Sequence, residues 1–135
     1  MTSKYPNLVT TIVGLALTSP PAAWASPTSD TCVALANART ALYSMLSAKD
    51  KSALDTLNAK VQATSTRIDA LIAGMTGADA KAAADFKTVW DQFKASRDDQ
   101  IIPAIYKGNI DDAKKIADGI QFERFSKMWR IMSCR

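Results

Sequence analysis

Two arginines occupy positions where the helical spacing of the chain otherwise places apolar side chains. Arg97 lies four residues after Phe93 and four before Ile101, and Arg124 lies four residues before Met128. Residues three or four positions apart share one face of a helix, so both guanidinium groups are expected on or beside the buried face. A guanidinium group binds a carboxylate through two parallel hydrogen bonds. The two arginines are therefore candidate ligands for a small anion.

Three further side chains are predicted to face the same space. With a rise of about 1.5 Å per residue, and with the turn at Gly108 as the common end, Arg124 falls opposite residues 90–93, which include Trp90, on the preceding helix. Arg39 and Tyr43 fall near the same height when the distance is measured from the cysteines near the two ends of the domain. Aromatic rings would exclude water from a bound anion. The predicted ligand site consists of Arg39, Tyr43, Trp90, Arg97 and Arg124.

The alternative is that neither buried-face arginine binds a ligand. Arg97 and Arg124 could each lay the aliphatic stem along the apolar stripe and direct the charged head to solvent. There the heads would form surface ion pairs, which contribute little to stability. The acidic residues within reach are Asp91, Asp98 and Glu123.

The chain contains no histidine, which restricts the chemistry of a helical protein. Histidine-ligated haem and the Glu-x-x-His di-iron arrangement are ruled out, and no imidazole can activate a serine. The adjacent pair Asp98-Asp99 diverges on a helix and needs no catalytic role. The methionines at helical spacing are interpreted as core residues rather than ligands of a soft metal: Met45, Met75, Met128 and Met132. We expect no enzyme activity, no metal and no cofactor.

The first 25 residues have the pattern of a secretory signal peptide. Lys4 precedes an uncharged segment, 8–17, and the small-residue pattern Ala23-Trp24-Ala25 follows. An apolar run of about ten residues is well short of the roughly twenty that span a bilayer, and no later segment is apolar enough to span one either. Residues 1–25 are therefore predicted to be removed. The mature chain, 26–135, is expected to have no membrane span and to be periplasmic or secreted.

Two cysteines stand near the ends of the mature chain. Cys32 and Cys134 are predicted to form a disulfide, because exported proteins meet oxidising conditions. A bridge closing about one hundred residues would stabilise the domain by roughly 4 to 5 kcal/mol in the chain-entropy model. The alternative is a pair of unrelated free thiols. A bridge would also require the start and the end of the domain to be neighbours.

The spacing of apolar residues predicts four helices. The first spans about 30–47. Asp50 and Ser52 can cap the second, which keeps a three-four alternation up to the Gly74–Gly77 segment. The third begins near Ala78. With short connections, these segments predict an all-α fold, an antiparallel up-down-up-down four-helix bundle closed by the terminal disulfide.

The second half of the chain carries two helix-disturbing residues. Pro103 removes a backbone hydrogen bond, so a kink or break is expected near 99–102. The fourth helix follows the turn at 107–109, and Gly119 inside it costs about 1 kcal/mol relative to alanine. Its expected buried residues are Ile110, Ala113, Ile116 or Ala117, Ile120, Phe125, Met128 and Ile131.

A loose pattern runs through this half of the chain. It consists of Trp90, Phe93, Arg97, Ile101-Ile102-Pro103, Gly108 and Ala113. Over about forty residues, this pattern resembles the third and fourth helices of the four-helix-bundle sensor domain that lies outside the membrane in methyl-accepting chemotaxis receptors. The resemblance implies a free-standing exported relative of a sensory domain, which would bind a small ligand or a membrane receptor.

Charge and apolar surface bear on the choice of partner. The net charge of +4 is spread along the chain, with no run longer than Lys114-Lys115, so no nucleic-acid partner is expected.

We predict a non-enzymatic binding or sensory module for a small anion. The alternative is a structural or chaperone-like interaction protein that acts through an apolar helix face or a homodimer, since Phe122, Phe125 and Trp129 widen the apolar surface of the last helix.

Overall fold

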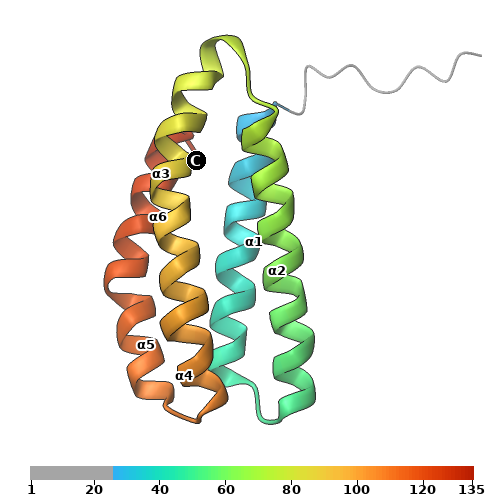
Figure 1. The fold of residues 1–135 in the computed structure, drawn as a ribbon, viewed down its shortest axis with the longest axis vertical. Helices are drawn as coiled ribbons and strands as arrows, with labels where there is room; N and C mark the ends of the chain where they lie inside the picture. Colours follow the sequence, from blue (N-terminus) through green and yellow to red (C-terminus); the bar gives the residue numbers. More distant parts are fainter. Residues whose placement is uncertain (1–25) are drawn as a thin grey trace, which may run out of the picture.

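The computed structural model describes residues 26–135, and every regular element within them is a helix. These elements form the predicted four-helix bundle (Figure 1). The predicted signal peptide lies outside the described residues. No helix in the described part is long and apolar enough to cross a membrane. In chain order the elements are α1 (Pro27–Ser47), α2 (Lys51–Ala73), η2 (Gly77–Asp79), α3 (Ala80–Ser96), η3 (Arg97–Ile101), α4 (Ile102–Tyr106), α5 (Ile110–Asp118) and α6 (Ile120–Ile131).

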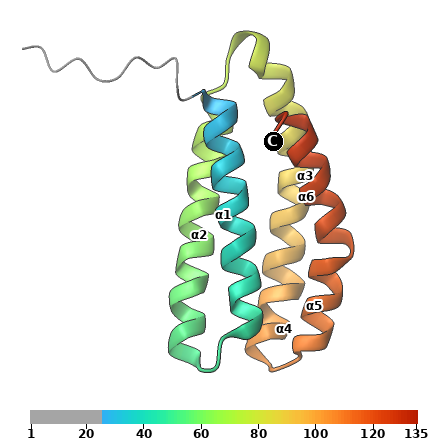
Figure 2. The same ribbon diagram turned by 180° about the vertical axis from the view of Figure 1, so that it is seen from behind.

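The bundle consists of two helix pairs. In both views α1 lies beside α2, and α3 lies beside α6 (Figures 1 and 2). Two apolar clusters fill the space between the pairs. One contains Leu35, Ile68 and Trp90, and the other contains Leu42 and Ile101. Because each cluster combines side chains of both pairs, the centre of the bundle is occupied by packed apolar groups.

Side-chain caps set the beginnings of the first two helices. The hydroxyl of Ser26 accepts a hydrogen bond of 3.1 Å from the backbone N–H of Ser29, and Pro27 occupies the first turn. The first helix therefore begins three residues before the predicted start at residue 30. The carboxylate of Asp50 accepts a 2.8 Å bond from the N–H of Ala53, which confirms Asp50 as the cap of α2.

The predicted irregularity before Pro103 is a π-helical turn rather than a break. The turn spans Arg97–Ile101, and the N–H of Ile102 donates to the carbonyl of Arg97, five residues back. Proline has no N–H to donate, and its ring crowds the carbonyl group one turn earlier. The wider π-helical turn accommodates Pro103 without interrupting the helix. Ile101, Ile102 and Ile105 all remain buried across the turn.

The prediction of one continuous fourth helix through Gly119 is wrong. Gly119 has φ −93° and ψ −108°, outside the helical region, and separates α5 from α6. A Cβ atom there would lie 2.9 Å from the carbonyl oxygen of Lys115, so a larger residue would clash. Because α6 begins anew at Ile120, the buried side chains of this segment also differ from those predicted. Ile120 is 44% exposed, whereas Gln121 is 2% exposed and takes the inward position.

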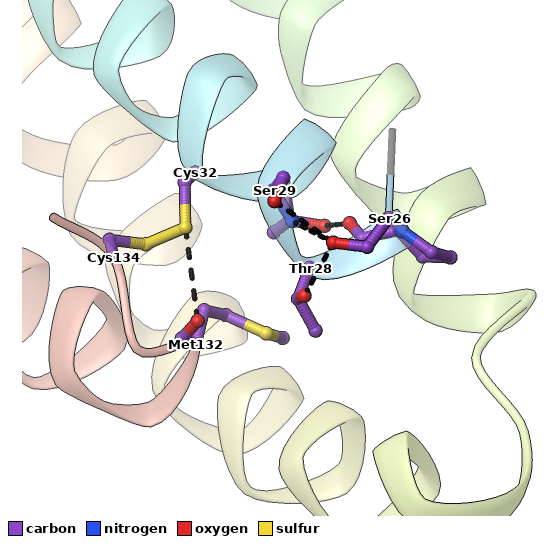
Figure 3. The surroundings of a disulfide bond; sticks show 8 residues. Ser26, Thr28, Ser29, Cys32, Met132 and Cys134 are labelled. Carbon is purple, nitrogen blue, oxygen red and sulfur yellow. Dashed lines mark hydrogen bonds between the residues drawn. A yellow bond between two sulfur atoms is a disulfide. The ribbon is translucent and has the colours of Figure 1, made fainter. Parts of the chain in front are cut away.

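A disulfide joins the two ends of the bundle, as predicted. Cys32, near the start of α1, is bonded to Cys134, just after α6, with a Cα–Cα distance of 5.6 Å (Figure 3). Ser133 adopts a left-handed conformation with φ 54°. This allows the N–H of Cys134 to donate to the carbonyl of Trp129 at 2.9 Å, a typical helix-closing arrangement. The end of α6 is therefore fixed both by the bridge and by its own cap.

Candidate ligand groove

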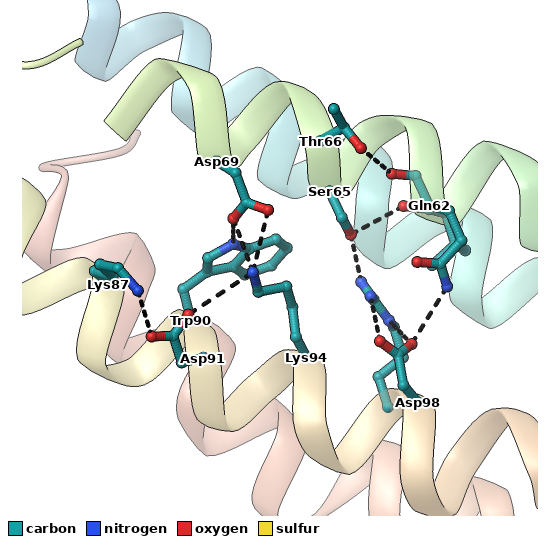
Figure 4. Close-up of polar contacts among 11 residues, drawn as sticks. Gln62, Ser65, Thr66, Asp69, Lys87, Trp90, Asp91, Lys94 and Asp98 are labelled. Atoms are coloured by element: carbon teal, nitrogen blue, oxygen red, sulfur yellow. Dashed lines mark hydrogen bonds and ion pairs between the residues drawn. The ribbon is translucent and has the colours of Figure 1, made fainter. Parts of the chain in front are cut away.

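Arg97 points inward, as the spacing predicts, but its head is used within the protein. It is 1% exposed, and its Nε and Nη2 donate to the two carboxylate oxygens of Asp98 at 2.8 and 3.1 Å. Its Nη1 donates to the hydroxyl of Ser65 on α2 at 2.6 Å (Figure 4). The alternative reading anticipated Asp98 as a partner, although not the burial of the head. An anion could reach this guanidinium only by displacing the Asp98 carboxylate.

Trp90 belongs to a polar network that links α3 to α2. Its indole N–H donates to Asp69 at 2.7 Å, and the ammonium group of Lys94 donates to both oxygens of the same carboxylate at 2.9 and 3.1 Å (Figure 4). The Trp90 side chain is fully buried among core residues. It is therefore a core residue with one satisfied polar atom. The Asp69 network was not predicted from the sequence, since residues 69 and 90 belong to different helices.

Arg124 joins α6 to α3. Its Nη1 donates to the hydroxyl of Ser96, and it lies 3.3 Å from the carbonyl oxygen of Gln92 and 3.4 Å from the side-chain oxygen of Gln121. The predicted height, opposite residues 90–93, is close to that of these partners. The contacts of Arg124 involve neither Arg97 nor its ion pair. The two buried-face arginines thus serve different helix junctions.

Arg39 is held by aromatic rings. The carbon at the centre of its guanidinium group lies 5.1 Å from the ring centroid of Tyr43, 5.3 Å from that of Phe122 and 4.9 Å from that of Phe125. All three distances lie within the range of cation–π attraction. Unlike Arg97, Arg39 forms no salt bridge with any carboxylate of residues 26–135. The guanidinium group therefore has no carboxylate partner among these residues and lies beside aromatic surface.

Tyr43 connects the arginine to α5. Its hydroxyl donates a 2.7 Å hydrogen bond to Asp118 and lies 3.2 Å from the carbonyl oxygen of Ala117. Partial burial, and then this bond to Asp118, raise the pKa of Tyr43, while the nearby Arg39 lowers it. The pKa of Asp118 is lowered by its bonds with Lys114 and with Tyr43. Tyr43 is therefore a neutral, oriented group next to the charged Arg39.

Arg39 and Tyr43 border an open groove of about 860 Å³ on the outer side of α1. α1 provides its floor, while α2 and α6 provide its two sides. The volume lies within the range of small-molecule sites, about 300 to 1,000 Å³. The lining residues are Ala36, Arg39, Thr40, Tyr43, Ser44, Ser47, Ala48, Ala53, Leu57, Phe125 and Trp129.

The structure therefore divides the predicted site. Arg39 and Tyr43 lie together at the groove, whereas Trp90, Arg97 and Arg124 lie at other helix junctions. The sequence indicated Phe125 as a buried residue and, with Trp129, as part of a wide apolar surface, but not as the side of a groove. A clearer signal for the groove was the row of small residues on α1, one every fourth position: Ala36, Thr40, Ser44 and Ala48.

Within residues 26–135, no group of three or more histidine, cysteine, aspartate or glutamate side chains could hold a metal ion. Comparisons of the chain with protein-family models, with characterised proteins and with solved structures gave no match. The resemblance to the chemotaxis-receptor sensor domain consequently remains a prediction from about forty residues of sequence. The groove itself is thus the basis for a functional proposal.

Proposed function

We propose that this protein is a non-enzymatic, exported binding module that holds a small anionic molecule in the groove on α1. The observation that carries the proposal is the guanidinium group of Arg39, which three rings hold at the groove without a carboxylate partner among the described residues. A guanidinium group presents paired donors that match a carboxylate or a phosphate group. The surrounding rings keep water from part of the group, which strengthens such a bond.

Export to the periplasm or to the exterior is part of the proposal. It is supported by the signal-like sequence of residues 1–25 and by the Cys32–Cys134 bridge, since disulfides persist mainly in oxidising compartments. We further propose an antiparallel up-down-up-down order of the helices. The short connections at 48–50 and 107–109 lie at one end of the bundle and the connection at 74–79 lies at the other, which supports this order (Figures 1 and 2).

A sensory role is the finer part of the proposal. The resemblance of about forty residues in the third and fourth helices to chemotaxis-receptor sensor domains supports a module that reports its ligand to a membrane receptor. Such a module would act by binding alone, and its readout would be a change in affinity for that receptor when the groove is occupied.

A second candidate is an interaction protein that works through apolar surface or as a homodimer. Phe122 is 45% exposed on α6, next to the half-buried, stacked rings of Phe125 and Trp129. Exposed aromatic surface of this kind is common at protein interfaces. A monomer at high protein concentration, observed by light scattering, would count against the homodimer.

A thermal-shift screen tests the principal proposal. The oxidised protein would be heated with monocarboxylates, amino acids, phosphate and nitrate, and a ligand of the folded state should raise the unfolding temperature. Arg39→Gln should abolish that shift. Arg67→Gln provides the matched control, because Arg67 is exposed on α2 and does not line the groove. An anion-induced shift that persists in Arg39→Gln would contradict the proposal.

A further inference from the structure

The charges along the groove favour a ligand with one anionic group. Among residues 26–135, Arg39 is the only charged residue that lines it. Within this described part of the chain, no acidic side chain lines the groove to repel an anion or to bind a cationic group of the ligand. A ligand with a single carboxylate or phosphate monoester could therefore pair that group with Arg39. The ammonium group of a zwitterionic amino acid would find no acidic partner in the groove.

The shape of the groove favours a ligand longer than a simple ion. Its floor runs from Ala36 to Ala48, which corresponds to roughly 18 Å at 1.5 Å of rise per residue. Small side chains at every turn keep this floor low. Leu57 on α2 and Trp129 on α6 line its two sides. Acetate or phosphate would occupy only a small part of this length.

The composition of the groove favours an apolar body attached to the anion. Phe125 and Trp129 stack with their centroids 5.4 Å apart and present half-buried ring surface to the groove. The hydroxyl of Ser44 donates to the backbone carbonyl of Thr40 at 2.9 Å, so it is already satisfied within the helix. Apolar ligand surface would displace water from these groups at little cost in lost hydrogen bonds.

We infer that the groove binds an elongated amphiphile that carries one anionic group, with that group at Arg39 and its apolar body along α1. The inference rests on the proposed function and specifies its ligand class. It also explains why the only charged residue lies beside aromatic rings. An anion bound there lies within reach of both the guanidinium donors and the apolar surface of Phe125.

Calorimetric titration of the oxidised protein tests this ligand class. The probes are decanoate below its micelle concentration and 1-naphthylacetate, compared with acetate and phosphate, and with the uncharged 1-decanol. Decanoate or 1-naphthylacetate should bind at least about tenfold more tightly than acetate. Arg39→Gln should weaken carboxylate binding about tenfold or more, the usual effect of losing a hydrogen bond to a charged group, and leave 1-decanol unchanged.

A second variant tests the location of the apolar body. Ser44→Phe places a ring on the exposed floor of the groove and should weaken decanoate and 1-decanol alike by about tenfold. Thr66→Phe is the matched control, since Thr66 is exposed on α2 outside the groove, and should bind like the wild type. Circular dichroism melts of each variant establish that it is folded.

The outcomes separate the inference from the proposed function. Acetate or phosphate could bind as tightly as decanoate, with binding that is lost in Arg39→Gln. In that case the inferred amphiphilic ligand class is wrong, but the proposed anion site at Arg39 is supported. If decanoate binds both Arg39→Gln and Ser44→Phe as tightly as it binds the wild type, it adsorbs elsewhere and the inference is overturned. If no anion shows binding that depends on Arg39, both the inference and the proposed function fail.

Discussion

The indole N–H of Trp90 donates a 2.7 Å hydrogen bond to Asp69, across the junction between α3 and α2. The indole is fully buried, while the carboxylate is half-exposed and also binds Lys94. One acidic group therefore satisfies a buried donor and a partly buried cation at the same time. This contact ties the two helix pairs together through α2 and α3.

We predict that Asp69→Ala destabilises the protein by about 1 to 3 kcal/mol, because it leaves the buried indole N–H without an acceptor. Asp69→Asn should cost less, since its amide oxygen can still accept the bond from Trp90. Urea denaturation followed by tryptophan fluorescence measures both free energies of unfolding.

The matched control for Asp69 is Asp85, which forms an exposed i,i+4 pair with Lys81 on α3. Asp85→Ala should change the free energy of unfolding by less than about 1 kcal/mol, because exposed ion pairs contribute little. If Asp69→Ala and Asp85→Ala lowered the free energy of unfolding equally, the contact with Trp90 would contribute no more to stability than an exposed ion pair.

Removal of the disulfide should destabilise the fold strongly. Cys32 and Cys134 are separated by 102 positions, and the chain-entropy model assigns about 4.7 kcal/mol to a closed loop of about 100 residues. We expect the Cys32→Ser/Cys134→Ser double variant to lose about 3 to 5 kcal/mol in urea denaturation under oxidising conditions. With reductant present, the wild type and the variant should have the same free energy of unfolding. A persistent difference would indicate an effect of the serines themselves.

Ser133→Gly should stabilise the protein. Ser133 has a left-handed backbone, which costs an L-residue about 1 to 2 kcal/mol and costs glycine almost nothing. Glycine loses more entropy on folding, so the expected net gain is about 0.5 to 1 kcal/mol. Thermal unfolding measures the gain. Gly108→Ala is the converse variant, because Gly108 has φ 80°, and it should lower stability; an equally large loss for Ser133→Gly would refute the conformational argument.

Stability at alkaline pH should depend on Tyr43. Burial and the bond to Asp118 raise the pKa of its phenol, so the folded state holds the proton more tightly than the unfolded state. The resulting stabilisation is complete below the unfolded pKa of about 10 and is lost as the pH rises through the folded pKa. Between pH 9 and pH 11, roughly, Tyr43→Phe should lose less stability than the wild type. Thermal unfolding at each pH measures this difference. If the unfolding temperatures of the two proteins fell in parallel as the pH rises, the prediction would be contradicted.

Much of the fold could be predicted because its signals are local. Asp50 caps a helix through a contact three residues away, and Pro103 disturbs the turn just before it, so both were readable from short segments. The pairing of Cys32 with Cys134 was readable because the chain has only two cysteines. The helix break was missed because glycine inside a helix is usually tolerated. At Gly119 the backbone leaves the helical region, and Gln121 rather than Ile120 turns inward.

The candidate site was harder to predict because it depends on which partner each arginine finds. Periodicity correctly placed Arg97 on the inner face, but the adjacent Asp98 folds back to bind the guanidinium, a contact that the helical period does not predict. Arg39 was predicted only by its height on the first helix, because a single residue gives no periodic pattern. The groove arises from three helices, so only the structure places Arg39 beside Phe122 and Phe125.

The most direct test of the central claim is the ¹H–¹⁵N NMR signal of each arginine side-chain Nε–H during titration with 1-naphthylacetate. Single Arg→Lys variants assign the Arg39, Arg97 and Arg124 signals. The Arg39 signal should shift with ligand concentration and saturate, because its guanidinium group binds the carboxylate. The Arg97 signal should stay in place, since Arg97 is already bonded to Asp98 and Ser65. Movement of the Arg97 or Arg124 signal with a stationary Arg39 signal would contradict the groove on α1 as the anion site.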